Sequence, residues 1–360
     1  MTLGRIEQSF TFAVGVTPKI VARNPSGTVD VRGEAREDVA VVVTCDPPDA
    51  LERGMAVTVE QRDDTVFVET RWPGLTGGLR TFKARVTMEI RAPRMSAVNA
   101  DLASGEATIA GIAGGIHLNT ASGDARVSDV HSEVQVHTAS GEVYLNDAHG
   151  TVRISTASGD LAIERATGEF SLKSASGDVR LDGLIGTLNV NTASGDVTAN
   201  GCAFTGIQVK TASGDAELAT ALDAHGDYHF QTVSGDVKLL VPAGTALTLT
   251  YATLSGDVSA ALPAQRDGGK RKGTLIVNGG GVPVQMSSMS GDCLIQAARG
   301  ALPPLPAIST AAPPVSVVTP APLTLPEETE PSETLRVLQA VERGELSIDE
   351  AMSRLDATDA

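Results

Sequence analysis

The residues best placed to do chemistry are carboxylates that recur at a fixed interval. Ser-Gly-Asp, or its Glu variant, occurs ten times between Ser104 and Asp292, and the first six of its glycines are spaced by 18 residues. A line of such carboxylates could bind calcium, because this hard cation takes several carboxylate and carbonyl oxygens. The candidate ligands are Asp160, Asp178, Asp196 and Asp215.

Alternatively, each Asp is a turn residue whose side chain accepts backbone N–H groups, as short polar side chains do. The nonapeptide repeat that marks calcium-binding β-helices is absent from the sequence. Glu106 and Glu142 replace Asp in this column, which indicates a looser geometry than a metal site requires. We therefore expect the carboxylates to be structural, without a metal or cofactor.

No other residues have the spacing of a catalytic site. The sequence contains no Gly-Lys-Ser/Thr phosphate loop, no Cys-x-x-Cys pair and no His-Glu-x-x-His motif. His131 and His149 lie 18 residues apart and are expected to stack in adjacent repeats, near Asp129 and Asp147. Nothing there completes a tetrahedral metal set. We predict that the chain is not an enzyme.

The repeats must position these side chains, and their pattern is that of strands. The unit from Gly177 to Gly195 contains two runs in which apolar and polar residues alternate, separated by glycine corners. Apolar residues recur at equivalent positions of successive units. They form columns such as Val143, Leu161, Val179 and Val197; Leu145, Ile163, Leu181 and Leu218; and Val134, Val152, Phe170 and Leu188.

A period near 20 residues indicates small units that bury one another's strands. The predicted fold is therefore all-β, a parallel β-solenoid of about ten 18–21-residue coils with two main sheets. Residues 99–298 are predicted to form the solenoid, and the β-rich but aperiodic residues 1–98 to start or cap it. Nine prolines make residues 299–331 a semi-extended linker.

The last segment, residues 332–360, has the only helical pattern in the chain. Ser332 and Ser347 are potential N-caps, and Glu350 completes a capping box, which predicts a helical hairpin. So small a hairpin cannot form a stable core alone. It either docks on the solenoid or, as a tethered module, self-associates or binds another protein. Its candidate interaction residues are Leu335, Leu338, Val341, Leu346, Met352 and Leu355.

Composition narrows the range of partners and locations. A net charge of −16 argues against nucleic acid, which requires a basic surface. The one basic cluster is predicted to be an exposed loop, with phosphate or membrane binding as the alternative; it comprises Arg266, Lys270, Arg271 and Lys272. No secretory signal and no transmembrane stretch is visible, so the expected location is the cytoplasm, with peripheral envelope association as an alternative.

The repeat also resembles a known family. "TASGDVTANG" and "SASGDVRLDGLIG" are similar to the bacterial "putative adhesin" β-strand-repeat family, a domain of unknown function, over about residues 20–298. "ETLRVLQAVERGELSIDEAMSRLDA" resembles the short helical-hairpin module that accompanies this domain in envelope-stress proteins, with Leu346 and Asp349 in place of the usual Ile and Glu. The resemblance implies adhesion or envelope association, and no catalytic residues carry over.

Three functions remain open at this point. The first is a non-enzymatic scaffold whose C-terminal hairpin binds a protein partner or another copy. The second is an adhesin-like or cell-envelope stress-response protein. The third is a carbohydrate-active β-helix enzyme, which would need clustered acidic residues in a groove, whereas this sequence has only regular columns.

Overall fold

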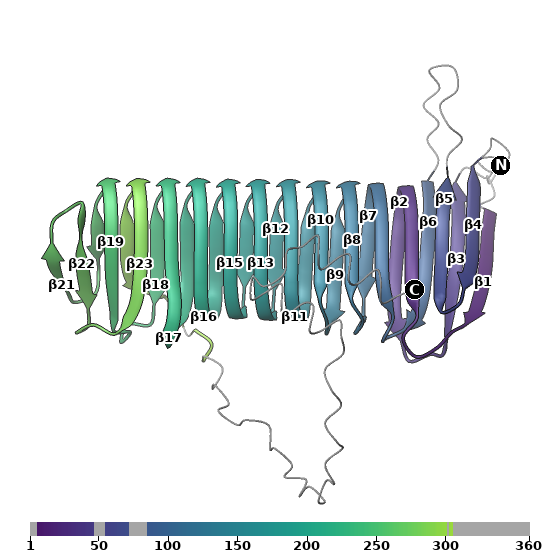
Figure 1. Ribbon diagram of the computed structural model, residues 1–360, viewed down its shortest axis with the longest axis horizontal. Coiled ribbons are helices and arrows are strands. Elements are labelled where there is room, and N and C mark those ends of the chain that lie inside the picture. Colours follow the sequence, from purple (N-terminus) through teal and green to yellow (C-terminus); the bar gives the residue numbers. More distant parts are fainter. Residues whose placement is uncertain (1–5, 47–54, 72–84, 301, 305–360) are drawn as a thin grey trace, which may run out of the picture. The chain divides into compact units, whose positions relative to one another are not determined.

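The computed structural model describes residues 6–46, 55–71, 85–300 and 302–304. The chain divides into two compact units, Met1–Ala307 and Ile308–Ala360, and all described residues belong to the first. They form 24 strands and no helix (Figure 1). None of the described segments could therefore cross a membrane as a helix. Most of the predicted linker and the whole predicted hairpin, 332–360, lie outside the described residues.

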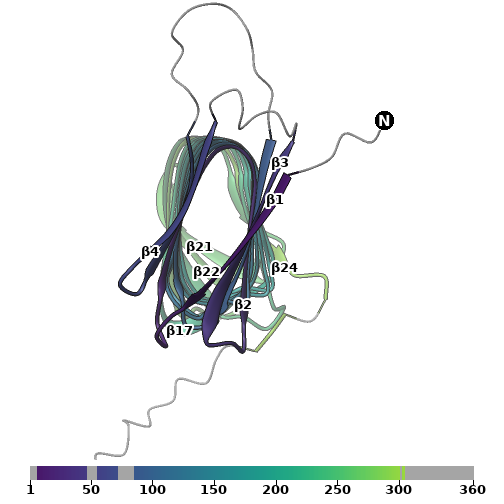
Figure 2. The same ribbon diagram turned by 90° about the vertical axis from the view of Figure 1, so that its right-hand side faces the viewer.

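The predicted architecture was wrong as stated. The strands belong to a single 24-stranded sheet instead of two main sheets, and its two ends are antiparallel. Strands such as β11 (Val143–Ser158) run through a corner, so the two sides of the fold stay connected by hydrogen bonds. The sheet closes around its core, and Figure 2 shows the strands enclosing an elongated ring. The helical hairpin is not part of the described fold.

The middle of the sheet is parallel and wound in coils, a coil being the stretch of chain that passes once around the core. Each strand pairs with the strand one coil away, mostly at an offset of 18 residues. These strands are β7 (Ala97–Ala110), β8 (Ile116–Ser122), β9 (Ala125–Val130), β10 (Val134–Ser140), β11, β12 (Leu161–Glu164), β13 (Thr167–Ser176), β14 (Val179–Asp182), β15 (Ile185–Ser194), β16 (Val197–Ser213), β17 (Ala216–Ser234) and β18 (Val237–Val241).

The N-terminal end combines one further coil with antiparallel strands. Its strands are β1 (Ile6–Ala13), β2 (Lys19–Glu34), β3 (Asp38–Asp46), β4 (Ala56–Arg62), β5 (Thr65–Arg71) and β6 (Arg85–Pro93). Strand β2 is a coil in register with β7, pairing Gly27 with Gly105. Strands β5 and β6 continue it in parallel, whereas β4, β3 and β1 add antiparallel edges. The described residues before 98 therefore form part of the wound sheet itself.

At the C-terminal end the coils are not in sequence order. The strands are β19 (Leu247–Ser255), β20 (Val258–Ala260), β21 (Ala264–Gly268), β22 (Lys272–Val277), β23 (Val282–Ser290) and β24 (Cys293–Ala297). Strand β23 lies between β17 and β19, and β24 lies between β18 and β20. The last coil of the sequence, which contains β23 and β24, therefore lies between the coil of β17 and β18 and the coil of β19 and β20. Beyond β19, the strands β22 and β21 add an antiparallel edge.

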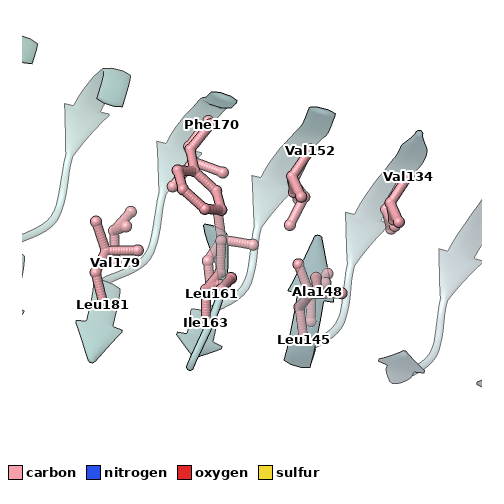
Figure 3. Close-up of a cluster of buried hydrophobic side chains, with 14 of the residues drawn as sticks. Val134, Leu145, Ala148, Val152, Leu161, Ile163, Phe170, Val179 and Leu181 are labelled. Carbon is pink, nitrogen blue, oxygen red and sulfur yellow. The ribbon is translucent and has the colours of Figure 1, made fainter. Parts of the chain in front are cut away.

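The core consists of the columns that alternation directs inward. Val143, Leu161, Val179 and Val197 pair in register, as the repeat predicts. Figure 3 shows Val134, Val152 and Phe170 in successive coils, facing Leu161, Ile163 and Leu181 across the interior. Each of these side chains is at most 2% exposed. Burying one aliphatic side chain stabilises a fold by roughly 1.5–3 kcal/mol, so the columns supply the main driving force.

The glycine of Ser-Gly-Asp is required by the spacing of the coils. Gly177 has a φ of 131°, a conformation that other residues rarely adopt. A Cβ on it would lie 2.3 Å from the carbonyl oxygen of Gly159, the equivalent residue one coil away. Glycines stack on glycines at this corner in the same way from Gly105 to Gly291. The repeat therefore keeps this residue because backbones meet there without room for a side chain.

Candidate binding surface

The acidic residues of the repeat form a hydrogen-bonded ladder along one corner. The N–H of Asp178 donates to Oδ1 of Asp160 at 2.9 Å, and the N–H of Asp196 donates to Oδ1 of Asp178 at 3.1 Å. Asp215 and Asp236 continue the series. Each carboxylate thus accepts from the acidic residue of the next coil, and not from its own turn as the sequence suggested. We call this series the Asp ladder.

This geometry gives the calcium candidates a structural task. Asp160, Asp178, Asp196 and Asp215 lie in one line, and each commits one carboxylate oxygen to a backbone N–H. Across the described residues, no three His, Cys, Asp or Glu side chains converge as a metal site would require. The line therefore resembles a row of caps on successive strands more than a coordination shell, which needs several oxygens around one point.

Four of the six histidines form two pairs. His131 and His149 stack with ring centroids 4.9 Å apart, as their spacing predicts. His117 Nδ1 and Gln135 Oε1 are 3.2 Å apart, and the Gln135 amide nitrogen is 3.0 Å from Nε2 of His137. The His131–His149 and His117–Gln135 contacts connect neighbouring coils, whereas Gln135 and His137 lie on the same strand. Among the described residues, neither place holds a group of three side chains that could bind a metal ion.

The three cysteines are buried and free, as small apolar residues would be. Burial raises the pKa of the Cys293 thiol to about 12 and that of the Cys202 thiol to about 11. A thiol reacts as a nucleophile through its thiolate, so these groups stay unreactive near neutral pH. The described residues therefore offer no activated cysteine.

A column of hydroxyl groups lies just inside the corner, before the Ser-Gly-Asp turn. Its members are between 5% and 7% exposed, and their hydroxyl oxygens have no hydrogen-bond partner among the described residues. They are Thr120, Thr138, Thr156, Ser174, Thr192, Thr211, Thr232 and Ser288. These hydroxyl groups do not bond one another along the column. In-register strands lie too far apart, at about 4.8 Å, for direct hydroxyl-to-hydroxyl bonds.

On the outer surface beside this column, from β8 to β23, lies a strip without acidic residues; one coil before it, the equivalent of Asn119 is Asp101. The register of the strands places two outward-facing side chains of each coil in this strip. The lack of acidic residues is notable because the whole chain has a net charge of −16. The strip comprises His117, Asn119, Gln135, His137, Arg153, Ser155, Ser171, Lys173, Asn189, Asn191, Gln208, Lys210, His229, Gln231, Gln285 and Ser287. We call it the acid-free strip. Lys173 and Lys210 form no ion pair with any other described residue.

Between the acid-free strip and the Asp ladder runs a column that changes character along the molecule. It is alanine in most coils, such as Ala121, Ala157 and Ala193. In the last three coils in space it is Val233, Met289 and Leu254, which are 49%, 55% and 59% exposed. The register of β17, β23 and β19 makes these three neighbours. We call them the apolar ridge. The sequences "TVSGD", "SMSGD" and "TLSGD" carried this signal, which the sequence analysis missed.

A groove of about 610 Å³ runs along the inner side of the apolar ridge. One wall is Val233 and Met289 with Ala193 and Ala212, and the other is Asn191, Lys210, Gln231 and Ser287 from the acid-free strip. We call this the ridge groove. A second groove, of about 700 Å³, lies between the same two columns nearer the N-terminus. Ala121 and His137 line it, and so does Asp101.

The basic cluster lies at the far end of the apolar ridge. The carbonyl oxygen of Arg271 accepts the N–H of Thr253 at 2.7 Å, directly before Leu254. Arg266, Lys270, Arg271 and Lys272 are all exposed, as predicted, but Arg266 and Lys272 lie in the antiparallel strands β21 and β22 instead of a loop. We call residues 266–272 the basic turn. The candidate interaction residues from Leu335 to Leu355 lie outside the described residues.

Comparison with known proteins identifies the family. The model of Toastrack DUF4097 matches residues 18–182 and 148–296 of this chain. The chain belongs to the Toastrack family. The match spans the Toastrack coils from β2 to β24, so the predicted resemblance to a β-repeat family of unknown function is confirmed at this level, without the helical-hairpin module. The comparison with curated proteins finds no match.

Solved structures similar to this Toastrack chain are remote. A "putative lipid binding protein" from Parabacteroides distasonis is 10% identical, covering 81% of this chain and 97% of that one, with a TM-score of 0.33. A "putative adhesin" from the same organism is 12% identical, with the same coverage and a TM-score of 0.31. A "putative cell adhesion protein" from Clostridium sporogenes is 11% identical, covering 82% and 100%, with a TM-score of 0.22. Likeness at this level does not define a shared function.

Proposed function

We propose that this Toastrack chain is a non-enzymatic, adhesin-like scaffold, in which the wound sheet presents a regular binding face and the C-terminal segment binds a protein partner or another copy. The observation that carries the proposal is the acid-free strip. In-register pairing repeats two outward side chains coil after coil, so polar groups are displayed at fixed intervals on a stiff support. Such an array suits recognition of an extended partner.

The acidic residues support binding over catalysis. A glycoside hydrolase uses two carboxyl groups that face each other across a bound sugar. Here the carboxylates of the Asp ladder follow one another along a line and accept backbone N–H groups. The three thiols are buried and protonated. Neither set has the arrangement of a general acid with a base, or of an activated nucleophile.

The experiment is to delete residues 327–360 and compare the variant with the full chain. The deletion should lower the oligomeric mass seen by light scattering, or abolish capture of a specific protein from a cell lysate. The melting temperature of the wound sheet should stay unchanged, because no described residue belongs to the deleted segment. If mass and captured proteins are both unchanged, the C-terminal segment has no binding role.

An adhesin-like or envelope-stress role is the specific form of this proposal that the resemblance seen in the sequence implies. Cell fractionation separates it from the cytoplasmic location expected from the sequence. Recovery of the protein in the envelope fraction, from which salt releases it, would favour the envelope role. Recovery only in the cytosolic fraction would exclude that role and leave a cytoplasmic scaffold.

A further inference from the structure

The apolar ridge is the one place where the described surface gathers large apolar side chains. Five large apolar residues are well exposed, and Val233, Met289 and Leu254 are three of them, in adjacent coils. The equivalent residue of earlier coils is alanine. Nothing in the packing of a coil requires a larger side chain at this outward position. Contiguous exposed apolar groups on a soluble fold mark a contact with another surface.

The charges around the ridge groove determine what can occupy it. No acidic residue lines the groove, whereas Lys210 does, and Lys173 lies two coils before it in the same column. The basic turn adjoins Leu254 at the other end. An occupant lying in the groove therefore meets apolar side chains on one side and cationic groups at both ends. It must be a chain that carries apolar and acidic residues together.

A flat anionic membrane fits these charges less well. The Asp ladder runs along the other side of the apolar ridge, three residues beyond it in each coil, as Asp236 follows Val233. A broad negative surface resting on the ridge would approach these carboxylates and be repelled. A narrow segment within the groove lies on the Lys210 side of the ridge. The groove thus favours a peptide segment over a lipid surface.

We propose that the ridge groove binds the acidic C-terminal segment, residues 327–360, of a second copy of this chain; this rests on the proposed function, in which that segment mediates self-association. The segment contains ten Asp and Glu residues and three Arg, a side-chain charge of −7, with no Lys. It also carries the apolar residues Leu335, Leu338 and Val341. The segment therefore combines the acidic and the apolar residues that an occupant of the ridge groove needs.

The connection between the described fold and the segment gives the segment a long reach. Residues 305–326 separate the last described residue from the segment, and 22 residues span at most about 75 Å when extended. Two copies that each place the segment in the other's groove form a closed two-fold dimer. After the first contact the second is intramolecular, so the two contacts reinforce each other.

The test uses the full chain and two matched groove variants. Analytical ultracentrifugation over a concentration series should show a monomer–dimer equilibrium for the unmodified protein. The double variant Val233→Ser, Met289→Ser should weaken the dimer at least about tenfold, and Lys210→Glu should weaken it more at low salt than at high salt. Met95→Ser is the control, because Met95 is 49% exposed but lies away from the ridge groove, and it should leave the dimer unchanged.

A mixing experiment tests the exchange directly. A groove variant (Val233→Ser, Met289→Ser) and a segment variant (Leu335→Ser, Leu338→Ser), each weakened alone, should form a mixed dimer held by one intact contact. A monomer at every concentration, or a dimer that the groove variants leave intact, would overturn the inference. If the groove variants leave the dimer intact but deletion of residues 327–360 abolishes it, the proposed function stands and only the ridge groove is rejected as the binding site.

Discussion

The backbone N–H of Asp292 donates to the Asp236 carboxylate at 2.7 Å, although 56 residues separate the two. Asp292 Oδ1 in turn accepts the N–H of Asp257 at 2.8 Å. The Asp ladder therefore runs from Asp236 to Asp292 to Asp257, against the order of the sequence. Asp257 ends it, because no backbone N–H of the described residues donates to its side chain.

This end position provides a matched test of the ladder. Asp215→Ala removes the acceptor of the Asp236 N–H, which lies 2.8 Å from it. Loss of a bond to a charged acceptor at a partly exposed corner should lower the free energy of unfolding by about 1 kcal/mol. Asp257→Ala removes no such bond and should change it little. Urea denaturation measures both; equal losses would mean that the ladder bonds contribute nothing.

Calcium should have no effect on the fold. The four candidate ligands, from Asp160 to Asp215, each bind a backbone N–H, and their line does not surround a point. We expect calorimetric titration to show no calcium binding tighter than about millimolar, the weak end of natural sites. A chelator should leave the melting temperature unchanged. A large drop in the presence of chelator would restore the calcium alternative.

Two glycines separate the effect of backbone conformation from that of close approach. Gly183 has a φ of 69° and open space around it, because a Cβ added there would lie 3.9 Å from its nearest neighbouring atom. Gly183→Ala should therefore cost only about 1 kcal/mol of stability. Gly177→Ala should cost about 3 kcal/mol or more, since it combines an unfavourable φ with contact against the Gly159 carbonyl. Equal costs by thermal unfolding would argue against the tight stacking of this corner.

The buried hydroxyl column gives a prediction whose sign is decisive. Thr156→Val replaces a buried hydroxyl without a described partner by a methyl group, and should stabilise the fold by about 1 kcal/mol. Thr253 is in the same column but donates to the Ser255 carbonyl at 3.0 Å. Thr253→Val should destabilise by a similar amount of about 1 kcal/mol. If Thr156→Val also destabilises, its hydroxyl has a bound water or another partner.

Arg165 should determine the acid sensitivity of one corner. Its hydrogen bond holds the pKa of Asp147 below the ordinary value of 3.8. A lowered folded-state pKa adds stability above the unfolded pKa, and this is lost as pH falls through the folded value. Arg165→Gln should thus reduce stability at neutral pH but not at pH values below the Asp147 pKa. Carboxyl NMR titration should show the Asp147 pKa rising in the variant; an unchanged pKa contradicts this origin.

The sequence predicted the coils well where the repeat is regular. Val143 through Val197 pair in the predicted register, and the Ser26-Gly27 pair matches Ser104-Gly105 because the same corner chemistry recurs there. Alternation and a constant period are local signals, and they determine which side chains point inward. The columns that result, including the hydroxyl column, therefore follow from the order of the residues alone.

The sequence did not predict how the coils are ordered and joined. Nothing local distinguishes the coil of Gly291 from that of Gly256, because both carry the same corner motif. The spatial order of these two coils depends on which strands fit the edge left by β17 and β18, and that is a non-local property. The acid-free strip and the apolar ridge were also missed, although their residues recur at fixed positions of the repeat. What the repeat does not show is the exchanged coil order that places Met289 between Val233 and Leu254. Only the 35-residue gap between those glycines indicated an irregularity.

The inserted coil also has a consequence for the order in which the protein is made. Coils up to β18 can be added one at a time as the chain emerges, each on the edge left by the previous one. The strand β19 has no edge of that kind, because its parallel neighbour β23 is synthesised after it. Residues 247–281 must therefore wait, with an apolar strand exposed, until β23 and β24 fill the space between. Truncation of the nascent chain anywhere from residue 260 to 290 should leave a species that chaperones bind, whereas truncation after a complete earlier coil should not.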